Sequence, residues 1–357
     1  MSEKQIKKIN VRVASVKPHR ASSDHPVLSV QNLHTSFITD SGEVKAVNGV
    51  SFNLDAGKIL GVVGESGSGK SVTAYSILQI LDQNGRIVDG DIKFKGKSLL
   101  EYGQKEMDAF RGNNCSIIFQ DPMTSLNPVF TVGYQMNEAL KLHTKYNTTK
   151  LATERSVQLL EMVGVNEPEK RLKQYPFELS GGMRQRVMIA MALACEPDIL
   201  IADEPTTALD VTIQAQILEL MKDLQKELGM AIILVTHDLG VIASMCDEII
   251  VMYGGRVCER GTAEDIFYRP AHEYTKGLLK SIPNTDNMKE RLVPIAGTPI
   301  NLLNMPKGCA FCPRCENALK ICLEEVPEEL MMPDGHFAAC WMNLKNEYEK
   351  EHGKEVS

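Results

Sequence analysis

The chain has 357 residues, which corresponds to two domains at roughly 150 residues each. With 43% hydrophobic and 24% charged residues it has the composition of an ordinary globular protein, which excludes a collagenous, low-complexity or largely disordered chain. The formal net charge of −7 argues against a protein whose main task is to grip nucleic acid, and nine cysteines are too few for a disulfide-dense secreted scaffold.

Residues 1–26 form a basic arm, with six basic side chains against Glu3 and Asp24 and hence a net charge of +4. Such an arm could touch anionic lipid or be a solvated, frayed terminus. Its first ten residues contain no apolar core of a signal peptide, and no run in the chain approaches the roughly 18 apolar residues of a membrane span. We therefore expect a protein of the cytosol or of a membrane surface.

Alternating strand and helix patterns from about residue 27 to 265 predict an α/β fold with a largely parallel sheet. The apolar runs Lys58–Val63, Ile199–Asp203 and Ala231–Thr236 are typical of buried strands. A glycine-rich turn follows the first run, and a helix is expected to begin near Lys70.

Two regions depart from this alternation. Between Gln120 and Leu179 the pattern is helical, as in Leu151–Val163, so we expect an inserted helical subdomain at about 121–180. From residue 266 to 357 the periodicity weakens, prolines recur and five of the nine cysteines occur, which predicts a small, loop-rich second unit.

Residues 64–71, with the sequence GESGSGKS, fit the phosphate-binding loop pattern. Its glycines let successive backbone N–H groups point inward at an anion, and the helix that follows adds its positive N-terminal end. Lys70 is expected to reach the β- and γ-phosphates of a nucleotide, and the Ser71 hydroxyl to ligate Mg²⁺. The alternative is a strand–helix turn that binds nothing, but the position between an apolar strand and a helix favours the loop.

The run Ile199–Asp203 ends in two adjacent carboxylates, whose side chains should diverge because they alternate along a strand. We assign Asp203 to the metal and Glu204 to the attacking water as general base. Paired acids at a strand end also occur as helix caps or in solvated loops, and the upstream phosphate loop favours the catalytic assignment.

Two further polar residues follow apolar runs. His237 follows Ala231–Val235; alone it would be a structural histidine, but beside the other motifs it is a candidate γ-phosphate contact. Gln120 follows Ser116–Phe119 and could bring a neutral amide to the metal-bound water.

Ser180, Gly181 and Gly182 open a strongly periodic helix, which makes a second helix N-terminus able to accept an anion. One ATP does not need two such ends from one chain. We therefore expect this segment to face a nucleotide held by another subunit; alone, it would be a capped helix with a glycine turn.

The phosphate loop, Gln120, LSGGM at 179–183, ILIADE at 199–204, Ala208-Leu209-Asp210 and His237 occur in the order found in ATP-binding-cassette (ABC) ATPases, which residues 27–265 resemble. The resemblance implies a P-loop NTPase cassette with an inserted helical subdomain and a small cysteine-containing C-terminal extension. It implies ATP and Mg²⁺ as cofactors and a head-to-tail pair of subunits, with Phe37 stacked on adenine and Asp210 in a segment that crosses between the two sites.

In this scheme Glu204 deprotonates water, His237 and Lys70 stabilise γ-phosphate charge, and Ser71, Asp203 and Gln120 hold Mg²⁺. The full set expected to bind nucleotide is Phe37, Gly64, Glu65, Ser66, Gly67, Ser68, Gly69, Lys70, Ser71, Val72, Gln120, Ser180, Gly181, Gly182 and Asp210.

Four segments resemble the ATPase subunits of dipeptide and oligopeptide importers: FQDPMTSLNP at 119–128, HEYTKGLL at 272–279 with Glu273 where proline is usual, GTP at 297–299, and the cysteine-containing stretch 307–315. The resemblance implies peptide import at the cytoplasmic face of the cell membrane. The implied partners are a second ATPase subunit, with a paralogue favoured, two permease subunits that provide the membrane contact, and an extracytoplasmic peptide-binding protein; nucleic acid is not among them.

Other functions stay open at this point. Nickel and other small-solute importers use close relatives of this ATPase. A soluble cassette ATPase would have coiled coils or two cassettes in one chain, and a kinase would not need the Ser180–Gly182 segment; the sequence favours neither.

The cysteines divide into two groups. Cys309, Cys315, Cys322 and Cys340 match four cysteines of the importer extension, where some members carry a four-iron–four-sulfur cluster; four thiolates can ligate such a cluster or Zn²⁺. The alternative is free thiols, and Cys312 is surplus to the ligand set. The remaining four are scattered along the chain: Cys115, Cys195, Cys246 and Cys258.

Overall fold

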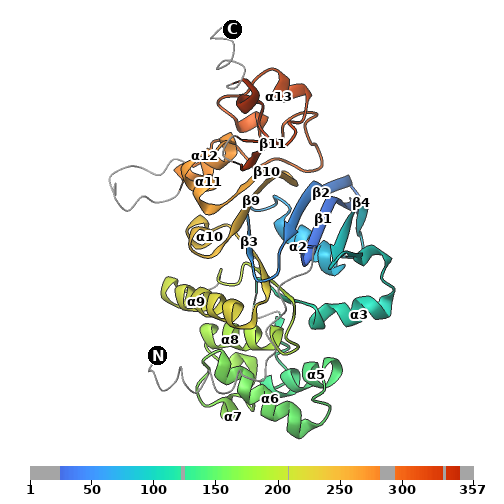
Figure 1. The fold of residues 1–357 in the computed structure, drawn as a ribbon, viewed down its shortest axis with the longest axis vertical. Helices are drawn as coiled ribbons and strands as arrows, with labels where there is room; N and C mark the ends of the chain where they lie inside the picture. The colour runs from blue at the N-terminus through green and yellow to red at the C-terminus, as the bar shows by residue number, and fades with distance from the viewer. Residues whose placement is uncertain (1–24, 122–124, 208, 282–293, 333–334, 346–357) are drawn as a thin grey trace. The chain divides into compact units, whose positions relative to one another are not determined.

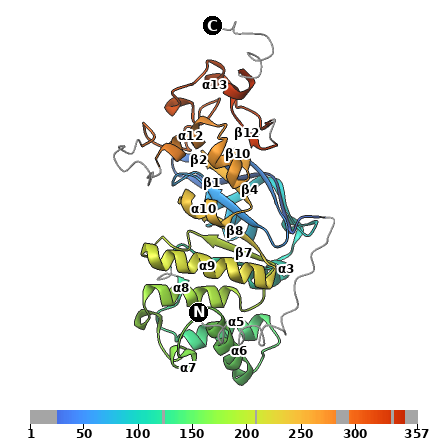
Figure 2. The ribbon, with the colours of Figure 1, turned by 60° about the vertical axis from the view of Figure 1, so that its left-hand side comes forward.

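The computed structural model describes residues 25–121, 125–207, 209–281, 294–332 and 335–345 (Figures 1 and 2). Most of the basic arm, Ala208 and the residues 122–124 of the importer-like segment lie outside the described residues. The chain divides into two compact units. The helical unit contains Leu54–Lys58 and Phe94–Ile233, with the described residues up to Leu28; the phosphate-loop unit contains Ser29–Asn53, Ile59–Lys93 and the described residues from Leu234 onward.

In the phosphate-loop unit, the long strands β2 (Gly42–Leu54), β1 (Leu28–Thr39) and β4 (Gly85–Phe94) are neighbours in one sheet. A second sheet contains β3 (Ile59–Val63), whose five residues are all buried because the strand is covered on both faces. It pairs in parallel with β9 (Glu248–Tyr253), from Leu60 opposite Glu248 to Val63 opposite Val251.

The C-terminal residues extend this second sheet. Strand β10 (Arg256–Gly261) pairs antiparallel with β9 and with β12 (Phe337–Ala338), which pairs with β11 (Leu330–Met331). The expected second unit at 266–357 therefore adds strands to a sheet of the phosphate-loop unit. Its first residues are helical, in α11 and α12, although its prolines predict a loop-rich segment. The helices of this unit are α2 (Lys70–Leu78), α10 (Leu239–Met245), α11 (Ala263–Tyr268), α12 (Glu273–Lys280), the turn η4 (Cys312–Arg314) and α13 (Ile321–Glu324).

In the helical unit, β6 (Cys115–Ile118) and β7 (Ile199–Asp203) pair in parallel. Strand β8 (Ala231–Thr236) begins in this unit and continues into the other. The helices are α3 (Gln104–Asn113), α5 (Val132–His143), α6 (Thr149–Met162), α7 (Pro168–Arg171), α8 (Gly181–Ala192) and α9 (Val211–Leu228).

Side-chain caps explain where several of these helices begin. Thr131, Thr148, Ser180 and Asp210 each accept a backbone N–H from the first turn of α5, α6, α8 and α9. Figures 1 and 2 both show α8 and α9 side by side. The predicted α/β fold with inserted helices is confirmed, and no described helix is long and apolar enough to cross a membrane.

Candidate functional site

The phosphate loop lies between β3 and α2, as predicted. Gly64 and Gly69 have φ of 154° and 100°, in the left-handed range. A Cβ at Gly64 would lie 2.2 Å from the Met252 carbonyl oxygen, and one at Gly69 2.4 Å from that of Ala46. Because the carbonyl groups of Met252 and Ala46 occupy the space that a side chain would need, glycine is required at both positions. The loop can therefore turn tightly against these two backbone segments.

Lys70 is held inside this turn. Its side chain is buried, and Nζ donates to the carbonyl oxygens of Gly64 (2.8 Å) and Glu65 (2.9 Å). Ser68 is also buried, and its Oγ has no hydrogen-bond partner among the described residues. An ammonium group and an unpartnered hydroxyl in one glycine-rich turn fit an anionic ligand such as a phosphate group. Ser71 and Val72, in the first turn of α2, are half-buried, and Ser66 and Gly67 are exposed.

Glu65 has contacts that the sequence did not predict. Its carboxylate accepts two hydrogen bonds from the Arg314 guanidinium, and its backbone N–H donates to the Tyr274 hydroxyl at 2.8 Å. Both partners come from the C-terminal part of the chain.

The two remaining candidates of this unit lie at the surface. His237 directly follows β8 and is exposed. Phe37 is half-buried with its ring against Gly85, since a Cβ there would come within 2.6 Å of the ring.

The catalytic candidates of the helical unit gather at the end of β7. Asp203 is completely buried, whereas Glu204 is partly exposed, so the two carboxylates diverge. Glu204 Oε2 accepts hydrogen bonds from Gln120 Nε2 and Thr207 Oγ1, both at 2.9 Å. Its φ of 47° is a left-handed conformation that costs a non-glycine residue energy and recurs at functional sites. The structure thus places Gln120 against Glu204, and it adds Thr207, which the sequence analysis missed.

Ser180–Gly182 form the N-terminus of α8. The exposed Ser180 caps the helix by accepting the Met183 N–H at 3.3 Å. Gly182 packs against α9, where a Cβ would lie 2.9 Å from Ile213 Cγ2. Asp210 caps α9 through the Ile213 N–H at 3.0 Å. The segment is therefore anchored to α9 on one side and leaves Ser180 exposed at the surface.

The C-terminal cysteines are free thiols rather than disulfides. The Cys309 N–H donates to the Cys322 carbonyl oxygen at 2.9 Å, which brings two of the four predicted ligands together. Burial is the largest cause that raises the pKa of Cys309 to about 12 and that of Cys315 to about 11, and the charge of Cys340 contributes to both shifts. Within the described ranges no three His, Cys, Asp or Glu side chains are placed to hold a metal ion.

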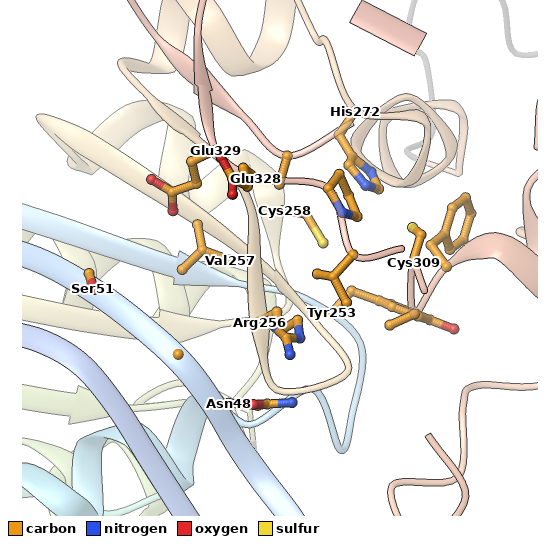
Figure 3. Close-up of a pocket in the computed structure, with 16 residues that line it drawn as sticks. Asn48, Ser51, Tyr253, Arg256, Val257, Cys258, His272, Cys309, Glu328 and Glu329 are labelled. Atoms are coloured by element: carbon orange, nitrogen blue, oxygen red, sulfur yellow. The ribbon is translucent and has the colours of Figure 1, made fainter. Parts of the chain in front are cut away.

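Cys258, one of the scattered cysteines, belongs near this group. It lies in β10 and lines a pocket of about 450 Å³ together with Cys309, Tyr253, Arg256 and His272 (Figure 3). Burial raises the pKa of Cys258 well above its ordinary value, and Cys309 and Cys340 add to this. A sixth thiol, from a strand of the sheet, therefore borders the five C-terminal cysteines.

Comparison with known proteins agrees with this geometry. A family model described as ABC transporter matches residues 47–207, and one described as oligopeptide/dipeptide transporter, C-terminal region, matches residues 258–322. The dipeptide transport ATP-binding protein DppD of Bacillus subtilis is 54% identical over 317 residues, which cover 88% of this chain and 94% of that protein. The oligopeptide transport ATP-binding protein OppD of Haemophilus influenzae is 51% identical, covering 90% of this chain and 98% of its own.

Solved structures show the same cassette. The dimeric ATP-binding cassette MJ0796, in a post-hydrolysis state bound to ADP and Pi, has a TM-score of 0.60 at 26% identity and covers 66% of this chain and 98% of its own. CbiO1 from Clostridium perfringens, part of an ABC transporter complex, has a TM-score of 0.59 at 29% identity, covering 69% and 92%. The likeness runs from the phosphate loop into the C-terminal cysteines, and the chain belongs to the ABC transporter ATPases, among their oligopeptide/dipeptide transport members.

Proposed function

We propose that this ATPase drives the import of dipeptides or oligopeptides through a membrane permease. The relatives at 51–54% identity, which match nearly the whole chain, are named for dipeptide and oligopeptide transport, and this supports the proposal. The observation that carries its catalytic part is the pair of hydrogen bonds that fix the partly exposed Glu204 carboxylate at the end of β7.

The residues divide the chemistry as follows. The phosphate loop and Lys70 bind the phosphates, His237 contacts the γ-phosphate and Phe37 stacks on the base. Ser71, Asp203 and Gln120 are the residues that would hold Mg²⁺, which neutralises charge on the transferred phosphoryl group. Glu204 orients water and takes its proton, while the amide of Gln120 and the hydroxyl of Thr207 keep the carboxylate in one orientation. Ser180–Gly182 and Asp210 complete the site of a second ATPase subunit.

Replacement of Glu204 tests this assignment. Glu204→Gln keeps the shape but loses the base, so the full chain should still bind ATP while hydrolysis falls by about 10²–10⁴-fold. The matched control is Glu219→Gln, at an exposed position on α9, which should hydrolyse ATP at the wild-type rate. Unchanged hydrolysis in Glu204→Gln would refute the assignment.

We infer that the permease docks on an apolar surface of the helical unit. Val129, Phe130 and Tyr134 are 69%, 41% and 51% exposed, and the two rings stack with centroids 4.6 Å apart. Exposed apolar patches of this kind mark protein contacts. Tyr134→Ala should lose co-purification with the permease subunits and keep ATP binding, whereas Leu142→Ser, at a position 73% exposed near the other end of α5, should keep both. Permease binding by Tyr134→Ala would place the contact elsewhere.

The solute and the cluster need separate measurements. Uptake of labelled peptides and uptake of nickel by the reconstituted complex, measured separately, distinguish the two importer types, and nickel uptake without peptide uptake would overturn the peptide assignment.

The four-iron–four-sulfur cluster at Cys309, Cys315, Cys322 and Cys340 stays a prediction from resemblance. Iron and sulfide analysis of anaerobically purified protein tests it: no iron, together with an unchanged fold in Cys315→Ser, would contradict it.

A further inference from the structure

The second residue of the phosphate loop is held from outside the loop. The Glu65 carboxylate receives Arg314 Nη1 at Oε2 (2.5 Å) and Nη2 at Oε1 (3.1 Å), a two-pronged pairing of guanidinium and carboxylate. The Glu65 N–H donates to the Tyr274 hydroxyl at 2.8 Å. Both the side chain and the backbone of this loop residue are therefore fixed by the region that matches the oligopeptide/dipeptide C-terminal family.

The Arg314 side chain is buried and held by hydrogen bonds. Its side chain is only 4% exposed, and all five of its N–H groups have acceptors. Besides the two bonds to Glu65, Nε donates to the Ala296 carbonyl oxygen (2.9 Å), Nη2 to that of Ile295 (3.2 Å) and Nη1 to the Tyr253 hydroxyl (3.3 Å). A lysine has one compact ammonium group and would not reproduce this set.

The surroundings make the contact rigid. Phe311, one residue before η4, is buried, and its ring lies 5.3 Å from those of both Tyr253 and Tyr274. Tyr274 is completely buried, so its hydroxyl has little freedom to leave the Glu65 N–H. The aromatic cluster thus joins the two residues that hold Glu65 into one packed group.

The geometry points to Arg314 as a positioning residue for ATP binding: by clamping Glu65 it holds the phosphate loop in its binding conformation. The affinity for ATP then depends on the C-terminal region as well as on the cassette. Arg314 itself lies between Cys312 and Cys315, so a change in the fold of the cysteine-containing segment would reach the loop through this side chain. The inference rests on the proposed role of the loop in ATP binding.

The test measures the Kd for Mg²⁺ and a fluorescent ATP analogue, and KM and kcat for ATP, in the full chain. Arg314→Met should raise Kd and KM about tenfold, equivalent to about 1.4 kcal/mol, with kcat within about twofold of wild type. The matched control is Arg260→Met, which breaks another arginine pair of the C-terminal region, to Glu329 at 3.2 Å, and should leave both constants unchanged. Emission of Trp341, the only tryptophan in the chain, reports whether each variant is folded.

The clamp acts through Glu65, which gives a second readout. Glu65→Gln should also weaken ATP binding, and the double variant should be no weaker than the poorer single variant. Full additivity would overturn the mechanism, as would unchanged affinity in folded Arg314→Met or an equal loss in Arg260→Met. If Arg314→Met does not fold, Arg314→Lys decides, and wild-type affinity in that variant overturns the inference. Lys70→Ala distinguishes the two proposals. If Lys70→Ala abolishes ATP binding while Arg314→Met leaves the affinity unchanged, the proposed ATP site stands and only the clamp is wrong. If Lys70→Ala binds ATP normally, the proposed ATP site is wrong as well.

Discussion

Low pH should lower the stability of the phosphate-loop unit, because one buried histidine takes up a proton more readily in the unfolded chain. His272 is 2% exposed and caps α12, where its Nδ1 accepts the Tyr274 N–H at 3.0 Å. Burial is the largest cause that lowers its pKa to about 4; the charge of Glu273 opposes this shift and that of Lys276 adds to it. In the unfolded chain an ordinary histidine has a pKa of about 6.5. Between pH 6.5 and pH 4 the histidine binds a proton in the unfolded chain but not in the folded chain. The free energy of unfolding therefore keeps this contribution above pH 6.5 and loses it as the pH falls toward 4.

The size of the effect follows from these two pKa values. Between pH 7 and pH 5 a shift from about 6.5 to about 4 lowers the free energy of unfolding by about 2 kcal/mol. Urea unfolding at both pH values measures it, with Trp341 as the probe, since its Nε1 donates to the Glu325 carbonyl oxygen within the same unit. Other groups titrate too, so the difference between variants is decisive.

His272→Asn keeps a capping side chain without a titrating ring, and it should lose about 2 kcal/mol less between pH 7 and pH 5 than wild type. His34→Asn, in strand β1 of the same unit, should behave like wild type. An equal acid loss in wild type and His272→Asn would refute the reasoning.

Two further variants probe the helical unit. Gly182→Val places a side chain against Ile213, which lies 2.9 Å from a Cβ built at this position. The variant should lower the free energy of unfolding by about 1–3 kcal/mol, measured by denaturant titration. Ser180→Thr keeps the capping hydroxyl and should leave the free energy of unfolding unchanged. Thr207→Val removes one hydrogen-bond donor to Glu204 and should lower kcat about tenfold, equivalent to about 1.4 kcal/mol, with an unchanged Kd for ATP. An unchanged kcat would show that this hydrogen bond does not position the carboxylate.

Local sequence patterns predicted many of the strands and helices. The apolar runs at 199–203 and 231–236 are strands β7 and β8 with the predicted bounds, because their four and five consecutive apolar residues need burial on both faces. Helix α6 begins at Thr149, two residues before the predicted Leu151, because Thr148 caps it. The candidate residues on local motifs lie at the strand and helix ends where the patterns placed them.

The contacts that the sequence did not reveal join residues far apart in the chain. Glu65 and Arg314 are 249 residues apart, and neither the phosphate-loop pattern nor the cysteine spacing implies that they meet. Cys258 is one of the scattered cysteines of the sequence, and the antiparallel pairing of β10 with β12 connects its strand to the C-terminal region. Such pairings depend on tertiary packing, which hydrophobic periodicity does not encode.

The pairing of β3 with β9 also matters while the chain is being made. Leu60 pairs with Glu248, and at roughly 5–20 residues per second the ribosome needs about 10–40 s to synthesise the residues between them. During that time the five residues of β3 lack this neighbour and leave one strand edge unpaired, and an unpaired edge of an apolar strand is prone to aggregation. The phosphate loop also lacks its later partners until then and beyond, since Gly64 packs against Met252 and Glu65 pairs with Arg314.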